Sequence, residues 1–498
     1  MVSDQFSVIG NGFLMDLVMP QINLELILPE IIITFFAILI LILEPFLSKG
    51  KKNFLAHLSW IAILLAFVAN IRLWNLMETT FSEMFIVDNF AVFFKFIFLA
   101  GSFLIILVSI SYLKREEMVH GEYYSLILFS TLGMMLMASS FNLVIIFLGL
   151  EIMSISLYVL AGFKREDLRS NEASLKYFLM GAFATGFLLY GIVMIYGSVG
   201  STNLEDIIKS IAYNGGNVDL LLWAGVGLLL VGFGFKIASV PFHMWVPDVY
   251  EGAPTPITAF ISAGSKAAGF AALLRVFLFS FGTIKMDWTT VIWIMSALTM
   301  TTGNIVAIAQ SNIKRMLAYS SIAHAGYVLV ALVAGKEAGV SSALFYLLAY
   351  TFMNIGAFTV VIALGRKDEE NTNLDDYSGL GTRHPWLAIF MMLFMLSLAG
   401  FPPTAGFMAK FYVFSAAVKS GYVGLVIIGV LNSLISVYYY LRIVVIMFMR
   451  PPLPEAEPIS LPLGSALVLL ISTWGVLQMG IFPQSLLTLA MLSVSSIF

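Results

Sequence analysis

The sequence predicts an all-α integral membrane protein with about fourteen transmembrane helices. Of its 498 residues, 60% are hydrophobic and only 11% are charged, whereas soluble proteins contain about 45–50% apolar and about 25% charged residues. The apolar residues gather in stretches close to the ~20 residues that a helix needs to cross the hydrocarbon core. The longest hydrophilic connection, at 365–385, is too short to hold a catalytic domain.

Fourteen stretches meet this length requirement. They lie roughly at 22–43, 57–76, 90–112, 122–140, 141–162, 174–196, 219–246, 256–280, 288–309, 315–335, 340–365, 385–416, 421–448 and 461–490. We expect four parts, which are three N-terminal helices (1–121), helices four to eight (122–280), helices nine to thirteen (281–448) and a C-terminal helix (449–498).

The orientation follows from the distribution of Lys and Arg, which are enriched in cytoplasmic loops. Loops after odd-numbered spans carry Lys49, Lys51, Lys52, Lys114, Arg115, Lys164, Arg165, Arg169, Lys314, Arg315, Arg366, Lys367, Arg383 and Arg450. Loops after even-numbered spans carry Arg72, Lys209, Lys285, Lys336 and Lys419. The excess of fourteen basic residues in the odd-numbered loops over five in the even-numbered loops predicts that the odd-numbered loops are cytoplasmic and that both termini are outside.

Composition excludes several classes of function. A net charge of −3 offers no basic footprint for nucleic acid. The chain has no cysteine, which excludes disulfides and thiolate-held zinc or iron–sulfur clusters, so we expect electron chemistry to occur on another subunit. There is no nucleotide-binding fingerprint. Residues 1–20 lack the basic region of a cleavable signal, and the first span is predicted to act as its own insertion signal.

The seventh predicted span combines two costly features. Lys236 lies deep in an apolar run, and a lysine at the middle of a bilayer costs about 2.5–3.5 kcal/mol by insertion scales. Pro241 follows five residues later and cannot donate a backbone hydrogen bond, which releases the carbonyl of Ile237. A broken helix with a lysine beside the break indicates a functional position.

The twelfth span repeats this combination. Pro402 and Pro403 release the carbonyls of Leu398 and Ala399, and Lys410 follows in the second half of the helix. The two broken spans are five apart, and an odd offset makes them run in opposite directions. Spans four to eight and nine to thirteen are therefore predicted to form two inverted repeats, a transporter architecture whose discontinuous helices mark the ion path.

Other ionisable residues within the spans are further candidates. Glu151 is the one well-centred carboxylate, and it would need a partner or a proton in hydrocarbon. Lys266 is central in the neighbouring span, whereas Lys176 lies near a cytoplasmic end, where its side chain can reach polar surroundings. His243 and His324 are possible proton relays because imidazole titrates near neutral pH, and both are equally compatible with structural roles.

The remaining charged residues of the spans have no partner that the sequence identifies. Lys95, Arg275 and Arg442 could face water inside the bundle or bind lipid headgroups. Asp248 and Glu251 are expected at the cytoplasmic edge, where they hold helix ends or help to form an entrance.

Three stretches carry a resemblance to a known family. "SVPFHMWVPDVYEGAPTPITAFISAGSKAAG" (239–269), "SNIKRMLAYSSIAHAGY" (311–327) and "SLAGFPPTAGFMAKFYVF" (397–414) resemble the antiporter-like membrane subunits of respiratory complex I, and "PDVYEGAP" resembles the N subunits of the bacterial NADH:quinone oxidoreductase. Lys410 separates the chain from the M subunits, which usually have glutamate there. The L subunits end in a long lateral helix that this chain lacks. The homologous photosynthetic subunit has a similar motif.

The resemblance implies a set of functional residues and partners. Proton-channel residues of the family fall at Glu151, Lys176, Lys236, Lys266 and Lys410. It implies a non-redox subunit of a proton-translocating enzyme in the bacterial inner membrane, which binds no cofactor or metal itself. NAD, FMN, iron–sulfur clusters and quinone are expected on partner subunits, and other membrane subunits and lipids are expected as neighbours.

The expected mechanism is electrostatic. Quinone reduction elsewhere in the complex would alter the Glu151–Lys236 interaction and pass a proton to Lys266 and then to Lys410, which releases it outside. One alternative is a cation/proton antiporter, which would be expected to add carboxylate ligands for sodium. Others are a subunit of a membrane-bound hydrogenase-type complex and a structural anchor whose buried charges only hold the bundle together.

Overall fold

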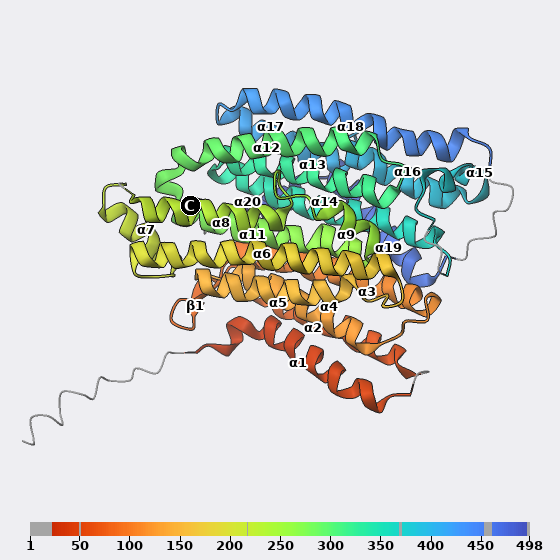
Figure 1. The fold of residues 1–498 in the computed structure, drawn as a ribbon, viewed down its shortest axis with the longest axis horizontal. Helices are drawn as coiled ribbons and strands as arrows, with labels where there is room; N and C mark the ends of the chain where they lie inside the picture. The colour runs from red at the N-terminus through yellow and green to blue at the C-terminus, as the bar shows by residue number, and fades with distance from the viewer. Residues whose placement is uncertain (1–21, 49–50, 217, 368–370, 453–460, 496–498) are drawn as a thin grey trace, which may run out of the picture.

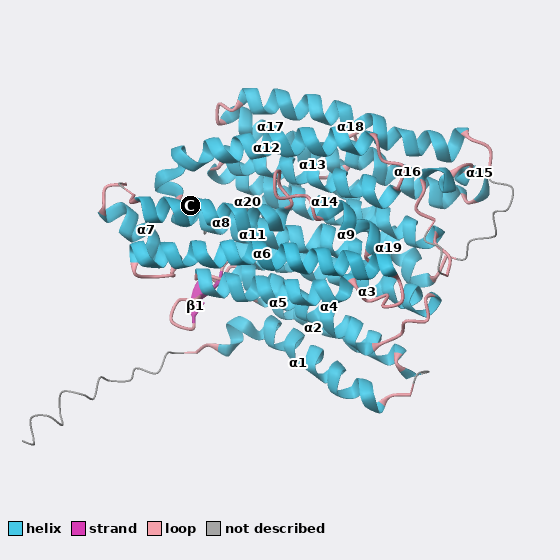
Figure 2. Ribbon diagram, in the orientation of Figure 1, coloured by secondary structure: helices cyan, strands magenta, loops and turns pink. Residues whose placement is uncertain are grey.

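Twelve helices in the described part of the chain are long and apolar enough to cross a membrane. In this computed structural model they lie side by side along one common direction, as Figures 1 and 2 show. The structure describes residues 22–48, 51–216, 218–367, 371–452 and 461–495. The predicted all-α membrane class is confirmed. Lys49 and the positions of both chain ends fall outside the described ranges, and the role of the first span as an insertion signal stays a prediction.

The candidate spans follow the predicted stretches closely. They are Leu24–Phe46 around α1 (Leu28–Leu43), α2 (Asn53–Arg72), α3 (Asn89–Arg115), α5 (Leu143–Ala161), α6 (Leu168–Val199), α8 (Leu220–Ile237), Thr255–Ser280, Trp288–Ile308 within α12 (Lys285–Ile308), α13 (Ile313–Ala334), α14 (Lys336–Leu364), α18 (Val423–Met449) and α19 (Leu463–Ile481). The two remaining stretches hold α4 (Gly121–Ser139) and the pair α16 (Pro385–Ala399) and α17 (Ala405–Lys419). The count of fourteen stays a prediction.

Shorter elements join these helices. They are α7 (Leu204–Tyr213), α9 (Val246–Gly252), α15 (Leu380–Arg383), α20 (Gln484–Leu492), the antiparallel strands β1 (Glu78–Thr80) and β2 (Phe85–Val87), and the 3₁₀ turns Leu24–Ile27, Glu44–Phe46, Gly282–Ile284 and Leu374–Tyr377. Within Thr255–Ser280, α10 (Thr255–Phe260) and α11 (Lys266–Leu274) alternate with π-helical turns at Ile261–Ser265 and Arg275–Ser280. Such wide turns are frequent at functional sites.

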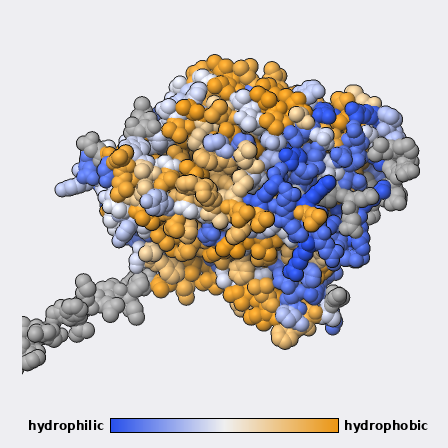
Figure 3. Space-filling model, in the orientation of Figure 1, coloured by the Kyte–Doolittle hydropathy of each residue, from blue (hydrophilic) through white to orange (hydrophobic). Residues whose placement is uncertain are grey.

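The two ends of the bundle differ in polarity. One end, which we call the hairpin end, carries β1, β2 and α7 (Figure 1). The opposite end, which we call the charged end, carries Lys164, Arg165, Lys367 and α15, and hydrophilic side chains gather over it in Figure 3. Between the two ends the visible surface is largely apolar, as expected of side chains that face lipid or other membrane subunits.

The first interrupted helix breaks where the sequence predicted. α8 ends at Ile237, Ala238 adopts a left-handed conformation with φ of 62°, and α9 begins only at Val246. The predicted break within the span 219–246 is confirmed, and His243 lies beyond it, where it would share a helix face with Lys236 only if the helix continued. A proline that cannot donate to the helix forces a turn over residues 238–245 instead, so the two side chains do not share a helix face.

The second interruption has the same form. α16 ends at Ala399, Gly400 takes a positive φ of 92°, and α17 begins at Ala405. Only glycine adopts this conformation without a steric penalty. The two broken helices thus each end in a left-handed residue that lies two or three positions before a proline.

Two pairs of distant connections are tied together by the same backbone pattern. The bonds are Leu143 N to Thr202 O at 2.9 Å and Leu204 N to Phe141 O at 2.9 Å in one pair, and Ile313 N to Thr372 O at 2.7 Å and Leu374 N to Ser311 O at 2.9 Å in the other. Each pair is centred on two asparagines that face each other, Asn142 with Asn203 and Asn312 with Asn373. The sequence repeats here as "TNLED" (202–206) and "TNLDD" (372–376).

Close helix packing depends on individual glycines. A Cβ atom on Gly133 of α4 would lie 2.4 Å from the carbonyl oxygen of Gly149 in α5. Gly133→Leu is therefore expected to destabilise the subunit by at least about 1–3 kcal/mol, because backbone atoms cannot move aside as side chains do. The measurement is the temperature at which the detergent-solubilised complex loses this chain.

Gly186→Leu is the matched control. Gly186 lies in α6, is exposed and has no atom within 4 Å of an added Cβ, so the same substitution should leave the temperature unchanged. Equal losses in the two variants would show that helix propensity, and not the α4–α5 contact, sets the effect.

Candidate functional site

Lys236 is held between α5 and α6 by aromatic rings rather than by hydrogen bonds. Its ammonium lies 5.7 Å from the ring centre of Tyr158 and 5.6 Å from that of Tyr177, close enough for a cation–π attraction. The nitrogen is buried and finds no hydrogen-bond partner among the described residues. Glu151 of α5 interacts with it electrostatically, and one carboxylate oxygen of Glu151 is likewise buried without a described partner.

Lys266 lies on the helix that crosses beside Lys236. The contact is made at Gly269, where an added Cβ would lie 3.4 Å from the Cβ of Lys236. Lys266 is three residues earlier, on the same face of α11. Its ammonium donates a hydrogen bond to Ser321 of α13 and lies 5.8 Å from the ring centre of Tyr250. The Tyr250 hydroxyl also contacts Ser321, at 3.3 Å.

His324 continues the polar path one turn along α13. It lies three residues after Ser321, and its Nδ1 is 2.6 Å from the Tyr346 hydroxyl while its Nε2 is 3.2 Å from the Tyr440 hydroxyl. The ring is buried. Ser321, three residues before His324, bonds Lys266, and Tyr327, three residues after it, lies under Lys410, so along α13 the imidazole lies between the contacts of the two ammonium groups.

Lys410 binds the backbone that the prolines release. Its ammonium donates to the carbonyls of Leu398 at 3.1 Å and Ala399 at 2.9 Å, and to the Ser433 hydroxyl at 2.9 Å. These two carbonyls are the ones that Pro402 and Pro403 were predicted to leave without partners. The ammonium also lies 4.9 Å from the ring centre of Tyr327, three residues beyond His324.

Lys176 belongs to an ion network at the charged end and not to the row of buried charged side chains in the interior. It contacts Glu172 at 2.7 Å and Asp248 at 2.8 Å, with 41% of its side chain exposed. Arg315 contacts Asp248 at 2.9 Å and Glu251 at 2.8 Å. The network therefore connects α6, α9 and α13 around the interrupted helix, where the sequence placed a helix-holding or entrance role for Asp248 and Glu251.

The electrostatics of the network keep Asp248 ionised. Burial acts to raise the pKa of its carboxyl, but hydrogen bonds from Lys176 and Arg315 outweigh burial, and the pKa lies below its usual value. A carboxyl with a depressed pKa contributes stability above its ordinary pKa, and this stability is lost as the pH falls through the depressed value. The ion pairs of Asp248 are thus intact at neutral pH.

Three predicted candidates lie outside the chain of contacts and have structural partners. Lys95 forms a buried ion pair with Glu30 at 2.7 Å, and Arg275 forms a buried two-point pair with Asp88 at 2.8 and 2.9 Å. Arg442 donates to the backbone carbonyls of Ile308 and Gln310. These are the partners that the sequence did not identify.

His243 is not part of the bonded path. It lies in the turn between α8 and α9, is partly exposed, and its Nδ1 has no hydrogen-bond partner among the described residues. It interacts electrostatically with Lys266, so its predicted relay role stays a prediction.

Several residues of the site were missed by sequence reasoning. Ser321, Tyr346 and Tyr440 carry hydroxyls that bond the charged groups, and only the i, i+3 spacing of Ser321 and His324 within "SIAHAGY" signals their common face. Lys314 was assigned to a loop, which was wrong, since it lies buried in the first turn of α13 and donates to the Ala253 carbonyl at 2.8 Å.

Side pockets adjoin both ends of the buried chain. One of about 470 Å³ lies between α5 and α6 and includes Tyr158 in its lining. A second of about 870 Å³ lies between α17 and α18, is lined mainly by apolar side chains and includes Lys410 and Ser433. The two pockets bring the ends of the chain of polar contacts close to the outer surface of the bundle.

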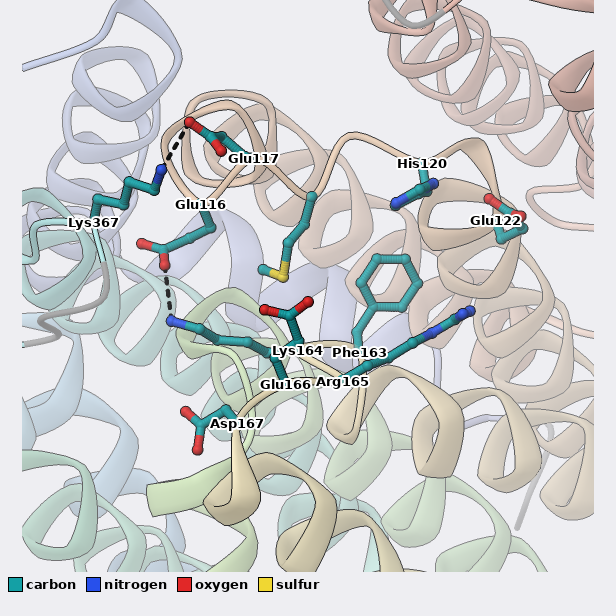
Figure 4. A pocket seen from close by; sticks show the side chains of 11 residues that line it. Glu116, Glu117, His120, Glu122, Phe163, Lys164, Arg165, Glu166, Asp167 and Lys367 are labelled. Atoms are coloured by element: carbon teal, nitrogen blue, oxygen red, sulfur yellow. Dashed lines mark hydrogen bonds and ion pairs between the residues drawn. The ribbon is translucent and has the colours of Figure 1, made fainter.

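A charged cavity of about 690 Å³ occupies the charged end (Figure 4). Ion pairs Glu116–Lys164 at 3.0 Å and Glu117–Lys367 at 2.7 Å cross it. His120 and Glu122 line its other side. Together with Glu44, they form the one group of side chains in the described residues whose donor atoms are close enough to hold a metal ion.

The helical fold with two interrupted helices, together with the row of buried charged side chains, is typical of antiporter-like membrane subunits. The family model described as NADH:quinone oxidoreductase/Mrp antiporter, TM, matches residues 140–436. A curated relative, NADH-quinone oxidoreductase subunit N of Trichlorobacter lovleyi, is 53% identical over 476 residues, which cover 96% of this chain and 98% of the relative. The chain therefore belongs to the subunit N family of NADH-quinone oxidoreductases, and the predicted resemblance is confirmed.

Solved structures agree with this assignment. A chain of respiratory complex I from Thermus thermophilus with bound aureothin superimposes with a TM-score of 0.79 at 33% identity, covering 93% of this chain and 99% of that one. A chain of the Mrp complex from Dietzia sp. DQ12-45-1b gives a TM-score of 0.84 at 19% identity, covering 96% and 98%. The second likeness shows the shared fold alone.

The contribution of the Arg315 ion network to the stability of the subunit can be tested by mutation. Arg315→Gln removes contacts to two carboxylates in a half-buried setting, and we expect it to lower stability by about 1–2 kcal/mol. Arg450→Gln is the matched control, because Arg450 pairs with Asp375 at an exposed site and such pairs contribute about 0–1 kcal/mol. The thermal midpoint of the solubilised complex measures both, and a loss as large in the control would contradict the assignment.

Proposed function

We propose that this chain is a proton-translocating, non-redox subunit of a membrane NADH:quinone oxidoreductase. The observation that carries the proposal is the row of ionisable side chains from Glu151 through Lys236, Lys266 and His324 to Lys410, in which each lysine is buried. Lysines with only a structural role would be expected to pair with carboxylates or reach the interface. Here Lys266 and Lys410 bond to hydroxyls and carbonyls instead, and neither forms an ion pair with a carboxylate of the described residues.

The names of the relatives support the assembly. The curated proteins are subunits of NADH-quinone oxidoreductases, and the Thermus thermophilus structure is a respiratory complex I. We infer that this chain works beside other membrane subunits in a bacterial inner membrane. It binds no cofactor or metal for the redox reaction, and NAD, FMN, iron–sulfur clusters and quinone are held by partner subunits.

The proton path has two parts with different character. Around Lys236, the ammonium itself and one carboxylate oxygen of Glu151 are buried and have no hydrogen-bond partner among the described residues. Buried polar groups of this kind are normally satisfied by bound water, so we assign a hydrated segment to this region. Between Lys266 and Lys410, in contrast, Ser321, His324 and Tyr440 provide side-chain hydrogen bonds.

An electrostatic switch at Glu151 is of adequate size to drive transfer. Two unit charges about 6 Å apart, beyond ion-pair contact, interact by about 3 kcal/mol at an effective dielectric constant of 20. Moving one charge against a potential of ~100 mV costs about 2.3 kcal/mol. A change that removes part of the Glu151–Lys236 attraction can therefore displace the proton from Lys236 toward Lys266 and Lys410, without any group of this chain being oxidised or reduced.

We further propose that helices four to eight (122–280) and nine to thirteen (281–448) are inverted repeats, preceded by residues 1–121 and followed by 449–498. The paired asparagine connections support this arrangement. Asn142 and Asn203 lie at the hairpin end whereas Asn312 and Asn373 lie at the charged end, as expected if the second repeat crosses the membrane in the opposite direction. The basic residues support a cytoplasmic charged end, which places both termini outside and the exit from Lys410 toward the hairpin end.

Two alternative functions are disfavoured by the same contacts. A sodium path calls for clustered oxygen ligands, and carboxylates are the strongest of these. In the described residues the buried carboxylates Glu30, Glu44, Asp88 and Glu116 are all paired with cations, and they lie off the central path. Pumping that proceeds without sodium would separate proton transport from cation exchange. Charge-neutralising variants that pump normally would support a purely structural anchor.

Neutralising either Glu151 or Lys236 should uncouple quinone reduction from proton pumping. We expect Glu151→Ala and Lys236→Ala each to reduce proton pumping by about tenfold or more, because the switch loses one partner. The measurement is quinone-reduction-driven acidification of inverted membrane vesicles. Lys209→Ala is the control, since Lys209 is an exposed lysine of α7 that pairs with Glu205. Full pumping in both site variants with an intact complex would refute the mechanism.

The imidazole of His324 can be tested separately. His324→Leu removes the side chain that bonds Tyr346 and Tyr440, and we expect slower pumping at an unchanged amount of assembled complex. His57→Leu alters a surface histidine that accepts a hydrogen bond from Trp60 and should have no effect. Unchanged pumping in His324→Leu would show that protons pass from Lys266 to Lys410 by another route.

A further inference from the structure

We propose that Glu44, His120 and Glu122 form a site for a divalent transition-metal ion, of which Zn²⁺ is the representative, at the charged end of the bundle. The three side chains come from the turn after α1 and from the start of α4. One donor atom from each lies within 4.8 Å of the other two. Neither the proton path nor the proposed function uses these residues.

The donor set matches the chemistry of zinc. One imidazole nitrogen and two carboxylate oxygens are the ligands of many Zn²⁺ sites, with metal–ligand distances of about 2.0–2.2 Å. The Glu44 oxygen Oε1 lies 3.9 Å from His120 Nδ1, a separation that a small shift of the exposed His120 ring adjusts to a common ion. Calcium and magnesium prefer all-oxygen sites, so the histidine favours a transition metal.

Glu44 is oriented for this role by the backbone. Its side chain is buried, and its second oxygen, Oε2, accepts a hydrogen bond from the Gly121 amide at 2.8 Å. A substituent on Gly121 would collide with that oxygen, since an added Cβ would lie 2.4 Å from it. The Glu44 carboxylate is thus held against Gly121, the residue between His120 and Glu122. Hydrogen bonds to the ligands of known metal sites orient them in the same way.

Glu122 supplies an oxygen, Oε2, that is buried and has no hydrogen-bond partner in the part of the chain that the structure describes. An uncompensated buried carboxylate oxygen is costly, and a bound cation is one way to remove that cost. His120 and Glu122 both line the charged cavity of about 690 Å³ (Figure 4), which gives an ion access and leaves room for water as a further ligand.

Lys52 competes with the metal for Glu44. It forms an ion pair with the same oxygen, Oε1, that would bind the ion. Binding therefore requires Lys52 to move, and 15% of its side chain is exposed. This competition leads to a specific expectation, namely that removal of the lysine charge strengthens metal binding.

The test uses the purified complex that contains this subunit, freed of exchangeable metal and titrated with ⁶⁵Zn²⁺ by equilibrium dialysis. His120→Ala and Glu122→Gln should each bind one Zn²⁺ fewer per complex than the parent, or bind it more than about tenfold more weakly. His120→Cys should keep the ion because a thiolate is a zinc ligand, and the chain has no other cysteine. Lys52→Met should bind more tightly.

The control is His57→Ala, which removes another surface histidine and should leave zinc binding unchanged. Native electrophoresis confirms that each variant complex is assembled. Zinc sites on partner subunits appear equally in all variants and cancel. Unchanged binding in either His120→Ala or Glu122→Gln overturns the proposal, as does an equal loss in His57→Ala. Should a ligand variant not assemble, Lys52→Met decides, since unaltered affinity there shows that Glu44 does not bind the ion.

Discussion

The structure depends on one constraint, which is that an ammonium group buried in a membrane protein must find its acceptors inside the protein. Lys410 meets this constraint with the carbonyls of Leu398 and Ala399, which become available because the helix is interrupted by prolines. The buried lysine and the interrupted helix thus supply hydrogen-bond partners to each other. Without the break, Lys410 would keep only its hydrogen bond to the Ser433 hydroxyl. Without the lysine, the Ala399 carbonyl would keep only the 3.4 Å contact from Ser433.

The two interrupted helices solve this problem differently, and the difference bears on function. At the first break, Lys236 does not bind the released backbone, and the rings of Tyr158 and Tyr177 surround it instead. A cation–π attraction is weaker than three hydrogen bonds to a charged group. Lys236 is thereby less firmly held than Lys410, which suits the group that is to be perturbed first by Glu151.

The charged residues away from the central path explain how the accessory helices are fixed. Glu30–Lys95 joins α1 to α3, and Asp88–Arg275 joins the start of α3 to the π-helical turn after α11. Removal of one partner from a buried pair of this kind costs about 3–5 kcal/mol. These pairs therefore fix α1 and α3 relative to each other and to the core, while the ion network around Arg315 braces the interrupted helix at the charged end.

The sequence by itself determined the membrane class, the approximate spans, the sites of both helix breaks and the identity of the central charged residues, because hydropathy, proline chemistry and the cost of a buried charge are local properties. It did not determine which groups meet. The partners of Lys95 and Arg275, the burial of Lys314, the hydroxyls of Ser321 and Tyr440 and the turn that separates His243 from Lys236 all depend on contacts between segments far apart in the chain. Such contacts are decided by helix packing, which fixes the rotation of each helix about its own axis, and an almost uniformly apolar sequence leaves that rotation largely unmarked.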